Sequence, residues 1–216
     1  MKTPFAVVVV LLLMVAALAA SLVLYPSLPS RMPTHWNLHG QVDGWSDKSW
    51  GAFLVPVIMT VFVFFIVAGQ WISPLNFKVE PFRDSFNYLL VIAAALVAYL
   101  HGVMLWAALH PDADVGRWLM VGIFVFFAWL GNLLGKTRRN FWVGIRTPWT
   151  LASERVWIAT HRKGAWIISG TGLVGAVAAW LGVSPAACLV LLVIGLLIPV
   201  VYSFWLSKKL EREPQS

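Results

Sequence analysis

The sequence predicts an all-α integral membrane protein with six transmembrane helices and with both termini in the cytoplasm. Three observations predict this fold class. Of the 216 residues, 60% are hydrophobic and only 12% are charged, whereas an average soluble domain is about 25% charged. Six apolar runs are each about 20 residues long, the length that a helix needs to cross a bilayer. The lysines and arginines lie mostly in alternate loops, as the positive-inside rule requires.

The six expected spans are helices, because lipid offers no hydrogen-bond partner to exposed backbone groups. They cover Phe5–Tyr25, Gly51–Ile72, Phe86–Leu109, Arg117–Gly135, Gly164–Val183 and Pro185–Leu206. Their apolar runs do not alternate with polar residues, as the strands of a membrane barrel would. The first run could instead be a secretory signal peptide, because Lys2 precedes it and small residues follow at 16–21. Cleavage there would leave five spans.

Thirteen of the sixteen lysines and arginines lie at the N-terminus, in the second and fourth loops and in the C-terminal tail. The other three are Arg31, Lys48 and Arg117. The side of the membrane that carries the thirteen cations is therefore expected to be the cytoplasmic side. We expect one membrane domain with four parts: residues 1–72 (two spans around a structured outer loop at 26–50), 73–135 (spans three and four), 136–163 (a basic cytoplasmic loop) and 164–216 (the last two spans and a short tail).

The outer loop carries a regular pattern of metal-binding residue types. The pattern places such residues at every fourth position: His35, His39, Asp43 and Asp47. On a helix they would share one face and could bind a transition metal. Gly40 and Gly44 argue against a continuous helix. We therefore expect a compact cap whose polar groups bond one another, and His35, His39 and Asp43 stay weak candidates for a metal site.

The fourth loop contains the start of a predicted amphipathic helix. Pro148 restricts the backbone of Thr147 and disfavours helix there. Thr150 is a plausible N-cap for a helix over Leu151–Lys163. Trp157 and His161 share a face of that helix. The helix would lie along the membrane interface and continue into the fifth span. It would serve either as a docking surface or as an elbow anchored in lipid.

Neither a catalytic motif nor a cofactor motif is present, so we expect no enzyme activity and no cofactor. The segment 131–137 imitates a phosphate-binding loop but has one residue too few between its glycines. His101, in the third span, is expected to be a neutral imidazole that bonds a neighbouring helix through Asn132 or Tyr99. An alternative function is a small transporter or channel with His101 and Asn132 near its path. A second alternative is a membrane metalloenzyme that uses the outer loop.

The two loops also resemble the SdpI family of bacterial membrane proteins. In the outer loop the resemblance rests on Pro33, His35, Trp36, Asn37, Gly40 and Lys48, which match a small N-terminal domain of unknown function common in that family. In the inner loop it rests on Asn140, Gly144, Ile145, Arg146, Thr147, Pro148, Trp149, Thr150, Trp157, Thr160 and His161. The inner motif is the longer and more specific of the two.

The resemblance implies a plasma (inner) membrane protein that gives immunity against an extracellular, membrane-active peptide toxin. It also implies inward signalling, in which a cytosolic transcriptional repressor is held at the membrane, without direct binding of nucleic acid. The outer residues expected to recognise the toxin are Pro33, His35, Trp36, Asn37 and Gly40. The inner residues expected to dock a partner or lipid are Asn140, Gly144, Arg146, Thr147, Pro148, Trp149, Trp157 and His161.

Overall fold

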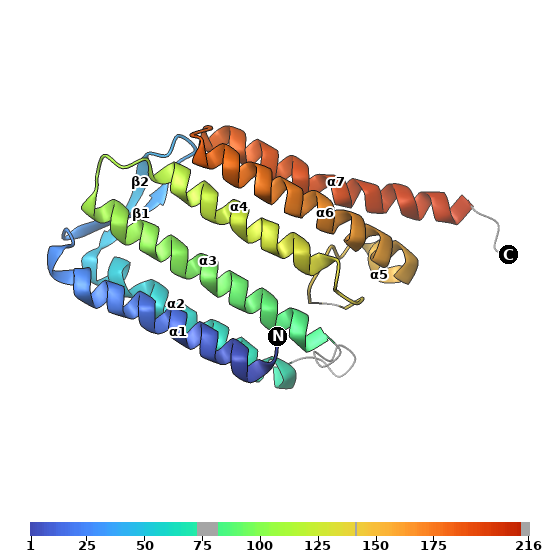
Figure 1. Cartoon of the computed structure of the whole chain (residues 1–216), viewed down its shortest axis with the longest axis horizontal. Coiled ribbons are helices and arrows are strands. Elements are labelled where there is room, and N and C mark those ends of the chain that lie inside the picture. The colour runs from blue at the N-terminus through green and yellow to red at the C-terminus, as the bar shows by residue number, and fades with distance from the viewer. Residues whose placement is uncertain (73–81, 141, 213–216) are drawn as a thin grey trace.

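The computed structural model describes residues 1–72, 82–140 and 142–212, and within these ranges the chain is mostly helical. Its long helices are α1 (Thr3–Leu24), α2 (Lys48–Ile72), α3 (Arg83–Leu109), α4 (Val115–Leu134), α6 (Glu154–Trp180) and α7 (Pro185–Arg212). They run along the long axis of the molecule, with α3 between the α1–α2 pair and α4 (Figure 1). Helix α6 packs against both α4 and α7.

Five of these helices are long and apolar enough to cross a membrane: α1, α2, α3, α4 and α7. They match five of the six expected spans. The remaining expected span, Gly164–Val183, lies largely within α6, which is not among the five. The composition of α6 explains why it is not among the five. Its first ten residues include four charged ones, and its remainder is rich in glycine and alanine. Length and hydropathy therefore support five spans.

The outer loop folds into a β-hairpin, so the expectation of an all-α protein is wrong at this point. Strand β1 (Arg31–Trp36) pairs antiparallel with β2 (Val42–Asp47), and Pro33 lies opposite Trp45. Gly40 adopts a positive φ of 76° in the turn between them, a conformation that glycine reaches at little cost. As the two glycines indicated, the four-residue repeat does not form a helix.

Helix α1 is an integral part of the bundle. Its buried residues Ala6, Val10 and Ala17 share one apolar cluster with Met59 of α2 and Val91 of α3. The N-terminal ammonium group lies 3.4 Å from a carboxylate oxygen of Asp84 at the start of α3. These contacts tie α1 to α2 and α3.

Helices α4 and α6 approach each other closely through small residues. A Cβ atom added to Gly172 of α6 would overlap the backbone of Ala128 in α4, and one added to Gly131 would overlap Ser169. Ser169 also donates a hydrogen bond to the carbonyl of Ala128, at 3.0 Å. Gly131 and Gly172 therefore allow close contact between helices within one bundle, as is common for membrane helices.

Candidate functional site

The hairpin and the inner loop lie at opposite ends of the bundle. Strands β1 and β2 occupy one end, whereas the N-terminus, the C-terminal end of α7 and the short helix α5 (Pro148–Ala152) occupy the other (Figure 1). The second loop contains the predicted cytoplasmic cation Lys78, which lies outside the described residues. The opposition predicted from the charges is thus present among the described residues. A joint role of the two ends has to act through the helices that connect them.

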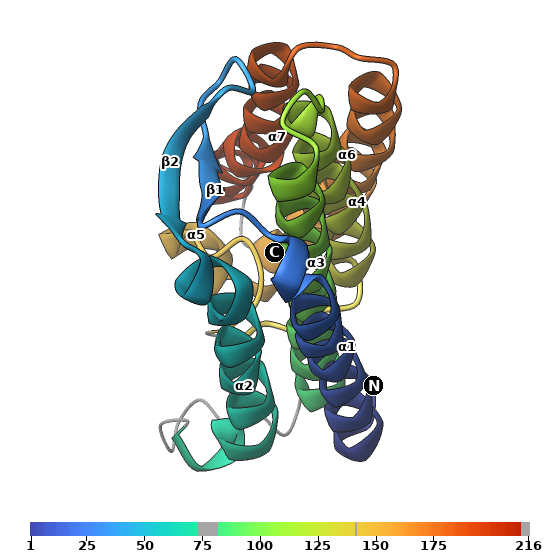
Figure 2. The ribbon, with the colours of Figure 1, turned by 90° about the vertical axis from the view of Figure 1, so that its left-hand side faces the viewer.

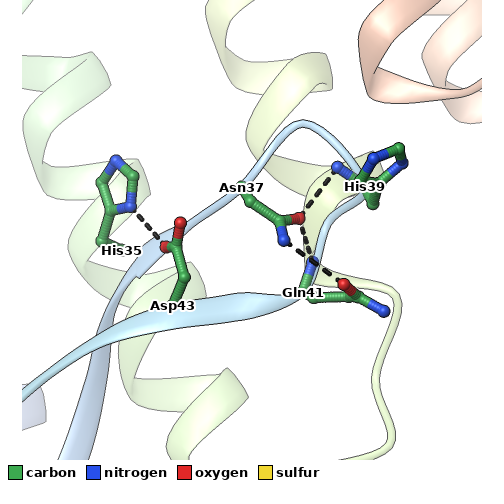
Figure 3. Close-up of polar contacts among 5 residues, drawn as sticks. All are labelled: His35, Asn37, His39, Gln41 and Asp43. Atoms are coloured by element: carbon green, nitrogen blue, oxygen red, sulfur yellow. Dashed lines mark hydrogen bonds and ion pairs between the residues drawn. The ribbon is translucent and has the colours of Figure 1, made fainter.

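Polar side chains organise the hairpin turn. The side-chain oxygen of Asn37 accepts hydrogen bonds from the backbone N–H groups of His39 and Gln41, at 2.9 and 3.0 Å. Farther along the strands, His35 Nδ1 and Asp43 Oδ1 are 2.5 Å apart (Figure 3). The expected compact cap with mutually bonded polar groups is therefore confirmed, in the form of a hairpin.

The hairpin, the end of α3 and the turn between α3 and α4 line a pocket of about 490 Å³, called here the outer pocket. Its lining residues are Pro29, Arg31, Pro33, Trp36, Gly40, Gln41, Val42, Trp45, Ala107, Ala108, Pro111, Asp112, Ala113 and Val115. Three of the five predicted recognition residues, Pro33, Trp36 and Gly40, belong to this lining. The other two, His35 and Asn37, lie outside it and stabilise the hairpin.

The outer pocket combines apolar walls with two exposed charges. Eight of its fourteen lining residues are proline, tryptophan or alanine, and two others, Arg31 and Asp112, carry opposite charges. Its size falls within the range of about 300–1,000 Å³ typical of ligand pockets. The mixture suits a segment with both apolar and polar groups. The predicted recognition residues did not include Trp45. Its position opposite Pro33 follows once the hairpin is recognised.

The three weak metal candidates do not converge. His35 and Asp43 are paired, while the ring of His39 lies at the turn, away from that pair (Figure 3). Among the described residues, no group of three or more histidine, cysteine, aspartate or glutamate side chains is placed to hold a metal ion. The geometry therefore offers no support for the metalloenzyme alternative.

His101 bonds a neighbouring helix as expected, but through a different partner. Its Nε2 lies 2.8 Å from Ser21 Oγ of α1, and Ser21 Oγ in turn lies 2.5 Å from the carbonyl oxygen of Ala52 in α2. Tyr99 instead donates to the carbonyl of Trp118, and Asn132 is exposed. The predicted partners Asn132 and Tyr99 are therefore wrong, and His101 ties α3 to α1 and α2.

The predicted helix Leu151–Lys163 is also wrong in its bounds. The chain forms two helices here: α5, capped by the Thr147 side chain, and α6, capped by Ser153. Thr150 is the third residue of α5, and its hydroxyl reaches back to the N–H of Thr147, at 2.9 Å. The expected amphipathic helix and the fifth expected span are one continuous helix, α6, because no residue between 154 and 180 interrupts it.

His161 anchors the inner loop, which we define as residues 136–153. Its Nε2 accepts a hydrogen bond from the backbone N–H of Ile145, at 2.9 Å, and its Nδ1 lies 2.8 Å from the carbonyl oxygen of Trp157. An N–H can only donate and a carbonyl can only accept, so the ring is neutral with its proton on Nδ1. Burial lowers the pKa of His161, and the hydrogen bond to Trp157 opposes part of that shift.

The other residues of the inner motif also bond inward. The Asn140 side-chain oxygen accepts from the N–H groups of Trp142 and Val143, both at 2.7 Å. Trp157 is fully buried and donates to the carbonyl of Thr137, at 3.0 Å. Trp149 donates to Ser203 of α7, at 2.6 Å. These bonds fasten the loop to α6 and α7.

Gly144 lies close to the His161 and Trp157 side chains of α6. Its φ is 130°, and an added Cβ atom would overlap Nε2 of His161 and lie 2.9 Å from Trp157. Of the eight residues predicted to dock a partner, only Arg146 and Pro148 are exposed. The remaining six, Asn140, Gly144, Thr147, Trp149, Trp157 and His161, are buried or half-buried and hold the loop in its fold.

The cations of the inner loop and of the first turns of α6 are accessible at this end. Lys136, Arg138, Arg139, Arg146, Arg155, Arg162 and Lys163 are all exposed. Arg139 also donates to the carbonyl of Leu151, at 3.1 Å, which ties the loop to α5. A partner that approached this end would first meet a positively charged surface, formed by the same cations that predict a cytoplasmic orientation.

The tip of the hairpin touches the second half of the chain. A Cβ atom added to Gly116, near the start of α4, would lie 3.0 Å from the Cα atom of Gly40 and 2.9 Å from Cγ of Pro185, at the start of α7. Viewed from this end, the hairpin extends from the α1–α2 side toward α7 (Figure 2). The first residues of α4 and α7 and the hairpin turn therefore share one end of the bundle.

Comparison with known proteins agrees with the two motifs. Residues 136–203 match the SdpI/YfhL protein family, and residues 12–60 match a domain of unknown function, DUF1648. The chain is 27% identical over 157 residues, 73% of each chain, to the immunity protein SdpI of Bacillus subtilis (strain 168). It is 33% identical over 64 residues to the uncharacterized membrane protein YbgB of the same organism, which is 30% of this chain and 63% of YbgB. No solved structure matches the chain.

Proposed function

From the confirmed resemblance of this multi-pass bacterial membrane protein to the SdpI family, we propose that it gives immunity against an extracellular, membrane-active peptide. The observation that carries the proposal is the similarity to an immunity protein over 73% of the chain. The two family matches, at residues 12–60 and 136–203, cover the hairpin and the inner loop. Within this proposal the outer pocket receives the peptide. Its apolar walls and opposite charges suit a peptide that partitions between water and lipid.

The proposal includes six spans and cytoplasmic termini. Helix α6 begins at the inner loop, and the turn that follows it leads to Pro185, beside the hairpin tip. A helix that connects the two ends in this way has to cross the bilayer even though its composition is less apolar than that of the other five. The excess of cations at the termini and at the inner loop favours the cytoplasm for that end.

The inner loop would hold a cytosolic repressor protein at the membrane through its exposed cations. Because the motif residues bond inward, we assign them the role of shaping the loop, and we assign partner contact to Arg146 and the neighbouring arginines. Charged groups at the rim of an interface mainly affect association rate and salt dependence. Retention of the repressor should therefore weaken as the salt concentration rises.

Peptide exposure of a deletion strain tests the immunity proposal. Cells that lack the gene should be more sensitive to a peptide secreted by the organism or its neighbours, and expression of the wild-type chain should restore tolerance. Unchanged sensitivity to every such peptide would remove the proposal.

Two tryptophan variants then test the role of the outer pocket. Trp45→Ala should lower the tolerated peptide concentration about tenfold or more, because an aromatic side chain that becomes buried on binding commonly dominates recognition. Trp50→Ala is the matched control, since Trp50 is also exposed but lies outside the pocket lining. With insertion of both variants checked by membrane fractionation, full protection by Trp45→Ala would argue against the pocket.

A further inference from the structure

The inner ends of α6 and α7 carry a cluster of cations and aromatic rings that the proposed immunity function does not use. The ammonium group of Lys163 lies 4.1 Å from the centre of the Tyr202 ring, and that of Lys209 lies 5.6 Å from the centre of the Trp205 ring. The two rings are themselves in contact, with centres 6.0 Å apart. Four side chains from two helices therefore form one continuous patch, called here the α6–α7 patch.

The lysines of the α6–α7 patch are held by aromatic rings and not by carboxylates. In the described part of the chain, no ion pair involves Lys163 or Lys209, whereas the neighbouring Lys208 pairs with Glu211 at 2.8 Å. A ring satisfies one side of an ammonium group without neutralising its charge. The remaining N–H donors of both lysines stay available for an anion.

The surroundings of the patch place it at the boundary between lipid and water. Trp166, one turn of α6 farther into the membrane than Lys163, is 81% exposed, and Trp205 is 55% exposed. Exposed tryptophans of this kind occupy the headgroup level of a bilayer. An anion that meets both lysines there would lie at the depth of the lipid phosphates.

We propose that the α6–α7 patch binds the phosphate of an anionic phospholipid, with Lys163 and Lys209 as the cationic contacts and with Tyr202 and Trp205 as the rings that position them. The acyl chains would lie along the exposed apolar side chains of α6 and α7, such as Trp166 and Ile198. Such a lipid would stabilise the pairing of α6 with α7, and hence the contact of α7 with the inner loop through Trp149 and Ser203.

Lipid retention by the purified full chain tests this proposal. The protein would be reconstituted in nanodiscs of phosphatidylcholine with or without phosphatidylglycerol, and the immobilised fraction of spin-labelled phosphatidylglycerol would be measured. Lys163→Gln/Lys209→Gln should bind this lipid about tenfold more weakly than the wild type, because the lipid phosphate loses both of its cationic contacts. Lys2→Gln/Lys136→Gln removes the same charge from the same end and should bind like the wild type.

A variant of the rings separates a built site from general charge attraction. Tyr202→Leu/Trp205→Leu keeps both lysines, and it should weaken binding severalfold because the ammonium groups lose their positioning. Equal losses in the two lysine pairs, or equal retention of spin-labelled phosphatidylcholine and phosphatidylglycerol by the wild type, would overturn the proposal. Circular dichroism of each variant in the same nanodiscs establishes that the helices are intact.

Discussion

At the scale of single residues, His161 shows why the inner loop should respond to pH. Its neutral ring accepts from Ile145 N–H and donates to the Trp157 carbonyl, and protonation would place an N–H of the ring against an N–H of the backbone. Burial lowers the pKa of His161 in the folded state. When the loop opens, the pKa of this ring returns to about 6.5, so the ring binds a proton more readily in the open state. The stability of the loop should therefore be complete above about pH 6.5 and should decrease as the pH falls toward the lowered folded-state value.

Hydrogen exchange of the Ile145 amide, corrected for intrinsic rates, would measure this opening at pH 7.5 and 5.5. His161→Leu should abolish the pH dependence and should cost about 1–3 kcal/mol, because the Ile145 N–H loses its acceptor. His39→Gln, at the exposed hairpin turn, should leave both the stability and the pH dependence unchanged. An opening free energy that is the same at both pH values in the wild type would contradict the role given to His161.

Gly144 sets a second limit at the same place. Gly144→Ala adds a side chain at a φ of 130° and in the position of the His161–Ile145 hydrogen bond, so it should destabilise the loop by about 1–3 kcal/mol or more. Gly182→Ala is the control, since Gly182 has a φ of 88° but open space around its Cα atom. Thermal unfolding in detergent should show a larger loss for Gly144→Ala than for Gly182→Ala, and equal losses would mean that the overlap is unimportant.

The inner motif could be recognised from the sequence, but its role could not. Asn140, Trp149 and His161 are polar or amphipathic and lie in a basic loop, which made them reasonable docking residues. The structure instead uses them to satisfy backbone groups and to reach α7, across separations of up to 54 residues for Trp149 and Ser203. Local spacing carries no information on such partners. The Thr147–Pro148 pair, typical of a helix start, was the one local signal of α5.

At the scale of elements, the contact between α4 and α6 should depend on one glycine face. Gly172→Ala places a methyl group against the backbone of Ala128 and should cost about 1–3 kcal/mol by overpacking. Gly170→Ala, two residues away on the same helix, meets nothing within 4 Å and should be neutral or slightly stabilising. Unfolding of both variants in the same detergent gives the comparison, and a tolerated Gly172→Ala would mean that the helices can separate without loss.

The hairpin shows why an element can be missed although its signals are present. Pro33 and Gly44 interrupt the residues that would otherwise read as strands, and the prominent four-residue repeat of His35 and its neighbours suggested a helical spacing. The Asn37 to Gln41 turn, with its glycine at 40, was the stronger signal, because such a turn joins two short antiparallel segments. The strands become stable only through the pairing of residues 31–36 with 42–47 and through packing on α3.

At the scale of the whole molecule, most of the architecture follows from composition and charge. Five expected spans coincide with apolar helices, and the two informative loops lie at opposite ends, because apolar length and the distribution of cations are properties of the chain alone. The proposed crossing of α6 is the exception. Its charged first turns and its glycine face lower its hydropathy, yet the glycines are what let α6 pack closely against α4. The same residues thus weaken the membrane signal and strengthen the helix contact.

Labelling of introduced cysteines tests the crossing of α6 and the orientation together. In a Cys188→Ala background, an impermeant maleimide added to intact cells should modify His39→Cys, at the exposed hairpin turn, and Ser184→Cys, in the exposed turn before α7. It should modify Arg146→Cys only after the cells are permeabilised. Labelling at 39 without labelling at 184 would mean that α6 does not cross, because an uncrossed α6 would leave residue 184 on the cytoplasmic side. Labelling at 146 without labelling at 39 would invert the orientation, and the outer pocket would then face the cytoplasm, where no extracellular peptide could reach it.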